Sequence, residues 1–191
     1  MTALAGRRWF RAQAIGTVRR PVGAPADPEA FYDPRAETTL EILPRLVDGL
    51  AGIEGYSHLV VLYWLDRARR PRAVPPPAPA EGQPALPPVG LVATRTPRRP
   101  NPIGLACPAL LRRSGNLLVV SGIDAWDETP ILDVKGYAPR DEGRPDASVP
   151  PWLDALWRRH DAERGAPPPS SQAGGGVTAS LDMNADSAAG P

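Results

Sequence analysis

Prolines constrain the middle of this chain more than any other feature. Pro97, Pro100, Pro102 and Gly104 fall within eight positions, after an apolar run from Val89 to Thr94 that predicts a strand. Proline fixes φ and pushes the preceding residue toward extended geometry, which excludes a helix here and disfavours a central strand. What remains is a stiff loop with few backbone states, and such a loop loses little entropy when it orders.

This loop carries polar side chains that a stiff backbone holds ready for a ligand. They are Arg95, Thr96, Arg98, Arg99 and Asn101. A rigid surface connection with solvated arginines explains the same residues. Loops carry binding sites preferentially but not always, so composition alone leaves both interpretations open.

A second polar stretch, Gly122 to Tyr137, interleaves charged residues with apolar ones. Asp127-Glu128-Thr129-Pro130 is a turn signal between two strand-like runs. Asp133 and Lys135 lie two positions apart, and therefore on one face of a strand. An internal ion pair that holds the strand explains them as well as a catalytic role does.

The two stretches together resemble one family. R-x-x-R-R-P-N-P-I-G-L from Arg95 to Leu105 and D-x-x-D-x-T-P-I-L-D-V-K-x-Y from Asp124 to Tyr137 are similar to motifs of the TsaA-like family. Its members are TrmO-type, S-adenosylmethionine-dependent tRNA (adenine-N6)-methyltransferases. The segments Ile15 to Arg19 and Gly52 to Leu59 also fit, and the resemblance covers about Ala14 to Asp141.

The resemblance implies a fold, a cofactor and partners. The family has a single-domain antiparallel β-barrel, binds S-adenosyl-L-methionine and is dimeric, with sites near the subunit interface. The implied reaction is N6-methylation of the threonylcarbamoylated adenosine beside the anticodon of tRNA.

The resemblance also assigns site residues. Those carried over to cofactor binding are Leu65, Asp66, Arg95, Leu105, Ser121, Gly122, Ile123 and Asp124. Candidates for the acceptor side or for catalysis are Asn101, Asp127, Asp133 and Lys135. An arginine suits the methionine carboxylate, and Leu105 and Ile123 suit the walls of an adenine slot. Asp66 also reads as a strand-end residue that caps the following turn.

Two residues depart from the family pattern. Glu128 stands where the family usually has the glycine of Asp-Gly-Thr-Pro, and Gly136 replaces the proline of Lys-Pro-Tyr. Because Glu128 lacks the freedom of glycine at positive φ, the turn must differ or be strained. The family's Pro-Arg-Gln element near the N-terminus has no clear counterpart.

Strand-like runs recur at short spacing, with turns between them and no alternating helices. They are Ala12–Val18, Thr38–Leu43, Tyr56–Leu65, Ile103–Arg112, Leu117–Ile123 and Ile131–Tyr137. Ser114-Gly115-Asn116 is a hairpin signal. The branched and aromatic content of Tyr56–Leu65 predicts a strand buried on both faces. The pattern predicts a mainly β, antiparallel barrel or sandwich, and no Gly-rich dinucleotide turn appears.

The predicted organisation is one β domain with extensions. Residues 1–11 form a loose start, 12–149 the barrel domain, 150–164 an amphipathic helix and 165–191 a disordered tail. Within the domain, 71–88 contains eight prolines and reads as a loop insertion without a packed element.

Composition limits the function classes. The formal net charge is +1, which lacks the strongly basic balance of many nucleic-acid binders. Cys107 is the only cysteine, so the chain predicts no internal disulfide, no cysteine-based metal site and a reducing, cytoplasmic setting. No secretory signal and no apolar run of membrane-spanning length is present.

Three functions remain open from the sequence. The first is methylation of tRNA, and the second is methylation of a small metabolite by the same fold, which the near-zero charge favours. The third is a non-catalytic module that keeps the cofactor pocket or only the dimer, which Glu128 favours. Salt-dependent tRNA binding separates the first two, and any methyl transfer excludes the third.

Overall fold

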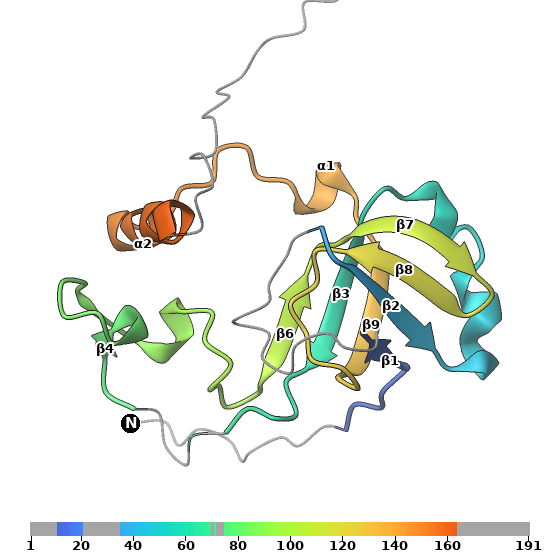
Figure 1. The fold of residues 1–191 in the computed structure, drawn as a ribbon, viewed down its shortest axis with the longest axis horizontal. Coiled ribbons are helices and arrows are strands. Elements are labelled where there is room, and N and C mark those ends of the chain that lie inside the picture. Colours follow the sequence, from blue (N-terminus) through green and yellow to red (C-terminus); the bar gives the residue numbers. More distant parts are fainter. Residues whose placement is uncertain (1–10, 21–34, 70, 72–74, 164–191) are drawn as a thin grey trace, which may run out of the picture. The chain divides into compact units, whose positions relative to one another are not determined.

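The computed structural model describes residues 11–20, 35–69, 71 and 75–163 of the 191. The chain divides into two compact units, within 1–147 and 148–191. The first unit is mainly β (Figure 1). In the second, the described residues form α2, Pro151–Glu163. The expected loose start and disordered tail lie outside the described residues, except for Arg11.

The β unit contains one large sheet of seven strands. They are β1 Gly16–Arg19, β2 Glu37–Ile42, β3 Leu59–Trp64, β6 Ile103–Ala106, β7 Ala109–Ser114, β8 Leu117–Ser121 and β9 Pro130–Gly136. The order is β6-β3-β9-β1-β2-β8-β7, and every neighbouring pair is antiparallel. The predicted mainly β, antiparallel class is confirmed, while the sheet order itself is open and ends at β6 and β7.

Buried side chains from one side of β1, β2, β3, β8 and β9 build the core. Leu59, Val61 and Tyr63 of β3 are buried, as are Leu40 of β2 and Leu118 of β8. The alternate residues of β3 are only half-buried. The prediction that β3 is buried on both faces is therefore wrong. Its apolar alternate residues form the second face of the sheet, which lies outside the core.

The Tyr63 ring leaves no space for a side chain at position 104, which is a glycine. The two residues are paired across β3 and β6, and a Cβ built on Gly104 overlaps the Tyr63 ring. The Tyr63 hydroxyl then donates a hydrogen bond to the carbonyl oxygen of Asp124 at 2.8 Å. This one side chain therefore joins β6 to the segment after β8.

The predicted hairpin at Ser114-Gly115-Asn116 connects β7 and β8. Ser114 pairs with Leu117, which leaves Gly115 and Asn116 as a two-residue loop. Gly115 has φ +61°, a value that glycine adopts without strain. The Asn116 side-chain amide donates to the Ile42 carbonyl at 2.6 Å and holds the turn against the end of β2.

Two of the predicted strands differ in the structure: one is divided into two strands, and the other is largely replaced by a 3-10 turn. Ile103–Arg112 is split into β6 and β7 by Cys107 and Pro108, because proline supplies no N–H to a ladder. In Val89–Thr94 only Val89 belongs to a strand, and Leu91–Ala93 form the 3-10 turn η4. Turn bonds, such as Ala93 N–H to Gly90 oxygen at 2.9 Å, satisfy that backbone locally.

The Pro-rich insertion contains more structure than expected. β4 (Ala78–Pro79) pairs with β5 (Pro88–Val89), and η3 (Ala80–Gly82) lies between them. Ala80 is 8% exposed, so the hairpin buries a small residue of its own. The remaining short elements are η1 Pro44–Leu50, η2 Ile53–Gly55 and α1 Pro139–Glu142.

Candidate functional site

The Arg95 side chain extends from the proline loop and is hydrogen-bonded to strand β6. Its Nη2 donates to the carbonyl oxygen of Leu105 at 3.3 Å. Arg99 Nη1 donates to the Thr94 oxygen at 2.6 Å, which stiffens the same turn. Asn101 is exposed just before β6. The structure thus brings together Arg95 and Leu105, two residues expected to bind the cofactor, and leaves the Arg95 side chain exposed.

Strand register extends this contact to two more candidates. Leu62 of β3 pairs with Leu105 of β6 on one side and with Asp133 of β9 on the other. Paired residues of antiparallel strands place their side chains on the same face. Lys135 forms an ion pair with Asp133 on that face. We call Arg95, Leu105, Asp133 and Lys135 the outer-face set.

A second group lies where β8 ends and the chain turns toward β9. Ser121 ends β8 between β2 and β7, Gly122 has φ +78°, and Ile123 is buried in the core. The side chain of Asp124 is exposed, while its carbonyl accepts the Tyr63 hydroxyl. Ile123 therefore belongs to the core, and its expected role as a wall of the adenine slot stays a prediction.

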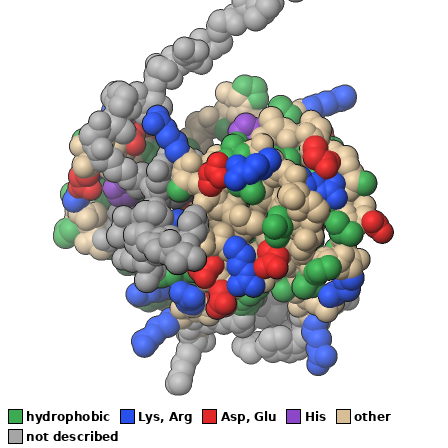
Figure 2. Space-filling view, turned by 45° about the vertical axis from the view of Figure 1, so that its right-hand side comes forward, with side chains coloured by type: hydrophobic (Ala, Val, Ile, Leu, Met, Phe, Trp, Pro, Cys, Tyr) green, Lys and Arg blue, Asp and Glu red, His purple; other side chains and the backbone are tan. Residues whose placement is uncertain are grey.

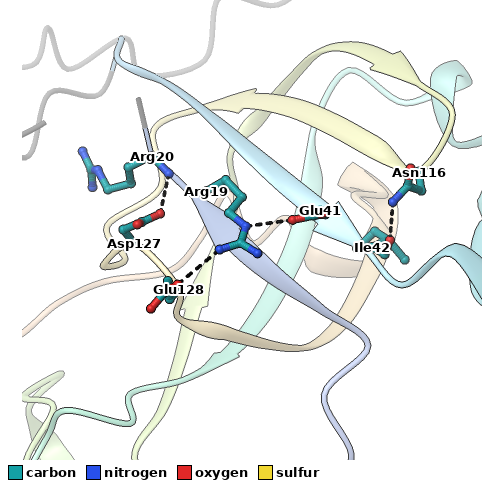
Figure 3. Close-up of polar contacts among 7 residues, drawn as sticks. All are labelled: Arg19, Arg20, Glu41, Ile42, Asn116, Asp127 and Glu128. Carbon is teal, nitrogen blue, oxygen red and sulfur yellow. Dashed lines mark hydrogen bonds and ion pairs between the residues drawn. The ribbon is translucent and has the colours of Figure 1, made fainter. Parts of the chain in front are cut away.

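Two arginines hold the turn at Asp127 and Glu128: Arg20, directly after β1, and Arg67, shortly after β3. The Arg20 backbone N–H donates to Asp127 Oδ1 at 2.9 Å (Figure 3). Arg20 Nη1 also donates to the Ala125 oxygen at 2.9 Å. Arg67 Nη2 donates to the Asp127 oxygen at 3.2 Å. We call Ser121, Gly122, Ile123, Asp124 and Asp127 the turn set.

The end of β3 connects to both neighbouring loops. The Leu65 N–H donates to the Pro102 oxygen at 2.8 Å, and the Asp66 N–H turns back to Trp64 at 2.8 Å. The next residue, Arg67, places its guanidinium 5.0 Å from the centre of the Trp126 ring, a cation–π geometry. In the chain, Asp66 thus lies between Leu65, which bonds the proline loop, and Arg67, which bonds the turn set.

Glu128 retains the backbone conformation that glycine would adopt. Its φ is +67°, and it is the one non-glycine residue at positive φ among the described residues. The Thr129 N–H closes the turn onto the Trp126 oxygen at 3.2 Å, and the Glu128 N–H bonds the Val18 oxygen at 2.8 Å. The turn is therefore strained rather than rebuilt, because its backbone bonds to β1 hold it in place.

The Glu128 side chain gains an ionic neighbour. Arg19 Nη1 lies 3.4 Å from Glu128 Oε1, and Arg19 Nε donates to Glu41 Oε2 at 2.7 Å (Figure 3). The hydrogen bond to Glu41 raises the pKa of Arg19 above its usual value. The added carboxylate of Glu128 is therefore placed beside a permanently charged guanidinium.

Sequence reasoning missed the residues that position the two sets. They are Tyr63, Arg20 and Arg67. Each donates a hydrogen bond to a residue of the turn set that lies at least 60 positions away in sequence. No local sequence signal marks these contacts, because the pairing of Tyr63 with Gly104 depends on the register of β3 and β6. Among the described residues, no group of three or more His, Cys, Asp or Glu side chains is placed to hold a metal ion. No helix in the described part of the chain has the length and apolarity of a membrane span.

Comparison with known proteins identifies the family. Residues 15–142 match the model of the tRNA-methyltransferase O N-terminal domain. The chain belongs to this TrmO, or TsaA-like, family. The match covers all seven strands of the large sheet and both residue sets, which confirms the resemblance carried by the two motifs.

Individual relatives agree with the family model. The chain is 50% identical over 101 residues to a probable S-adenosyl-L-methionine-binding protein of Archaeoglobus fulgidus, covering 52% of this chain and 26% of that protein. It is 30% identical over 152 residues to the tRNA (adenine(37)-N6)-methyltransferase of Escherichia coli, covering 73% and 63%. It thus matches less than two thirds of the length of either relative.

A solved structure shares the fold. The crystal structure of TrmO from Pseudomonas aeruginosa superposes with a TM-score of 0.59 at 25% identity, covering 85% of this chain and 77% of that one.

Proposed function

We propose that this protein is an S-adenosylmethionine-dependent methyltransferase that methylates N6 of the threonylcarbamoylated adenosine beside the anticodon of tRNA. The observation that carries the proposal is the family match over residues 15–142, which contains the Arg95–Leu105 contact. The S-adenosyl-L-methionine-binding and tRNA-methylating relatives support the cofactor and the reaction class.

The residues present fit this cofactor. Arg95 offers an exposed guanidinium that suits a carboxylate, and Leu105 beside it is 45% exposed and offers an apolar wall. S-adenosylmethionine supplies an already activated methyl group. The protein has only to hold donor and acceptor in line, so positioning is its main contribution.

In this proposal each of the two sets contributes residues to both the cofactor side and the acceptor side. The outer-face set contains a cation, an apolar side chain and the Asp133–Lys135 pair. The turn set presents the exposed side chains of Asp124 and Asp127 on a turn held by arginines. We assign Arg95, Leu65, Asp66, Leu105 and Ser121–Asp124 to the cofactor. We assign Asn101, Asp127, Asp133 and Lys135 to the acceptor side.

Barrel closure, dimerisation and a cytoplasmic location complete the proposal. His58 and Ala109 form a bridge in line with the β3–β6 pairing, and Leu59 N–H bonds the Pro108 oxygen at 3.0 Å. These contacts link β3 to the start of β7, which supports β6 and β7 acting as one bent strand that closes the sheet. The family resemblance supports a dimer, and a tRNA substrate implies the cytoplasm.

One observation favours a small-metabolite acceptor instead. Basic and acidic side chains are interspersed on the face drawn in Figure 2, in keeping with the net charge of +1. Tight nucleic-acid binding usually uses a gathered basic surface.

Calorimetric titration with S-adenosylmethionine tests the proposal first. Arg95→Ala is expected to weaken binding about tenfold or more, because a charge-assisted contact contributes about 1.5–3 kcal/mol. Arg98→Ala is the matched control, an exposed arginine of the same loop. Absence of binding to the wild-type protein contradicts the proposal and favours the non-catalytic module.

The acceptor is tested with labelled methyl donor. Transfer to tRNA that carries the threonylcarbamoyl group, and not to tRNA that lacks it, is the expected result. Cofactor binding without transfer to either tRNA moves the assignment to a metabolite acceptor.

A further inference from the structure

The outer face of β3 and β9 continues beyond the outer-face set. The pairing that joins Leu62 to Asp133 and Val60 to Lys135 continues in the hydrogen bond from the Tyr137 N–H to the His58 oxygen at 2.9 Å. Because side chains on one face recur every second residue, His58 and Tyr137 follow Lys135 on the same face.

Two aromatic rings meet at this end of the face. The His58 and Tyr137 ring centres lie 6.4 Å apart with an interplanar angle of 63°, an edge-to-face arrangement. Ser57 Oγ lies 3.0 Å from His58 Nδ1 and fixes the imidazole. His58 is exposed and Tyr137 is half-buried, so the rings are held by their neighbours yet reach solvent.

A cation borders the pair on its own face, and a third ring packs on the opposite face, where Gly136 pairs with the buried Leu59. Tyr56 is 45% exposed, and its ring lies so close over Gly136 that a Cβ there would collide with it. Proline stands at this position in the family pattern, and here glycine makes room for the ring. The Lys135 side chain is 62% exposed beside its partner Asp133.

We propose that His58 and Tyr137 form a stacking site for an unpaired nucleobase of the RNA acceptor, with Lys135 placed for the adjoining phosphate. Aromatic faces stack on any base, and a nearby cation neutralises the backbone. The site shares its face with the outer-face set, so a base held here lies next to the proposed methyl-transfer residues. This inference rests on the proposed function and specifies how the acceptor is recognised.

The alternative is that the two rings only stabilise the fold and bind no ligand. An aromatic pair at the ends of two strands also stabilises a sheet, since cross-strand aromatic pairs contribute to sheet stability. A purely structural pair predicts that its loss lowers the melting temperature and leaves the affinity for RNA unchanged.

Binding of an anticodon stem-loop RNA, without S-adenosylmethionine, decides between the two. Tyr137→Leu and His58→Ala are each expected to weaken binding about tenfold, while Tyr137→Phe, which keeps the ring, restores it. Leu111→Ala, an exposed apolar residue of β7, serves as the control. Unchanged affinity in both ring-removing variants overturns the proposal.

Salt dependence separates stacking from charge. Lys135→Gln is expected to reduce the slope of log K against log salt by about one, whereas Tyr137→Leu lowers affinity at every salt concentration with the slope unchanged. A changed slope in Tyr137→Leu, or an unchanged slope in Lys135→Gln, contradicts the assigned roles.

The failure of this inference is distinguishable from that of the proposed function. Calorimetry with S-adenosylmethionine tests the cofactor site in each variant. Intact cofactor binding and tRNA methylation with unchanged RNA affinity in Tyr137→Leu overturns the stacking site alone. If the wild-type protein methylates no tRNA, the stem-loop comparison still determines whether these rings bind RNA.

Discussion

Glu128 shows how a single residue retains a family conformation at a cost. A non-glycine residue in the left-handed region costs on the order of 1–2 kcal/mol, and Glu128 has φ +67°. Its ion pair with Arg19 is exposed and 3.4 Å long, so it offsets little of that cost. The backbone bonds from the turn to β1 hold the conformation instead.

Glu128→Gly should therefore stabilise the protein by about 1 kcal/mol, because glycine adopts the turn without strain. Glu128→Ala is the matched variant, since it removes the carboxylate and keeps the Cβ. Urea unfolding of the three proteins gives the comparison. A glycine variant no more stable than the alanine variant would show that φ is not the source of the strain.

At Gly104 we expect a glycine to be required because of packing. A methyl group at this position enters the space of the Tyr63 ring. Gly104→Ala is expected to lower the free energy of unfolding by about 1–3 kcal/mol, as other overpacking substitutions do. Gly90→Ala is the control, because Gly90 has φ −73° and nothing within 4 Å of a built Cβ. Equal melting temperatures for the two variants would contradict the packing argument.

At the scale of elements, β3 organises the candidate site. Its inner residue Tyr63 anchors the turn set, its outer residue Leu62 joins Leu105 to Asp133, and its end leads into Arg67. One strand thus connects every segment that the family resemblance assigns to the site.

Tyr63→Phe isolates the anchoring hydrogen bond, because phenylalanine keeps the ring over Gly104. Loss of the bond to the Asp124 carbonyl should weaken S-adenosylmethionine binding by about 1 kcal/mol. Amide hydrogen exchange should quicken at residues 121–127, while the amides of β3 keep their protection. Faster exchange across the whole sheet would instead show a general loss of stability.

The elements also show what a sequence can predict. Apolar alternation and turn residues are local signals, so they predict β2, β8, β9 and the Gly115 hairpin within two residues of the observed bounds. They place the starts of β1 and β3 three or four residues too early. Contacts between distant segments left no such signal. Tyr63 and Asp124 are 61 positions apart, and Glu37 and Arg112 are 75 apart. The family motifs supplied the candidate residues, and strand register was needed to place Leu105 beside Leu62 and Asp133.

For the molecule as a whole, one ion pair links two strands that are not hydrogen-bonded to each other. Glu37 of β2 reaches over β8 to Arg112 of β7, with Nη1–Oε1 and Nη2–Oε2 distances of 3.0 and 2.7 Å. The hydrogen bonds from Arg112 lower the pKa of Glu37 below its usual value of 4.5. The ionised carboxylate is therefore favoured in the folded protein relative to the unfolded chain.

The sign of the resulting pH dependence follows from linkage. A carboxylate with a depressed folded-state pKa contributes stability above its unfolded pKa, and this contribution disappears as the pH falls through the folded value. Glu37→Gln should thus lower the melting temperature near pH 7, and the difference from wild type should shrink below about pH 4.5. In an Arg112→Ala background the same substitution should give no pH-dependent difference. A difference that persists unchanged at pH 3 would mean that Glu37 stabilises β7 through packing rather than through its charge.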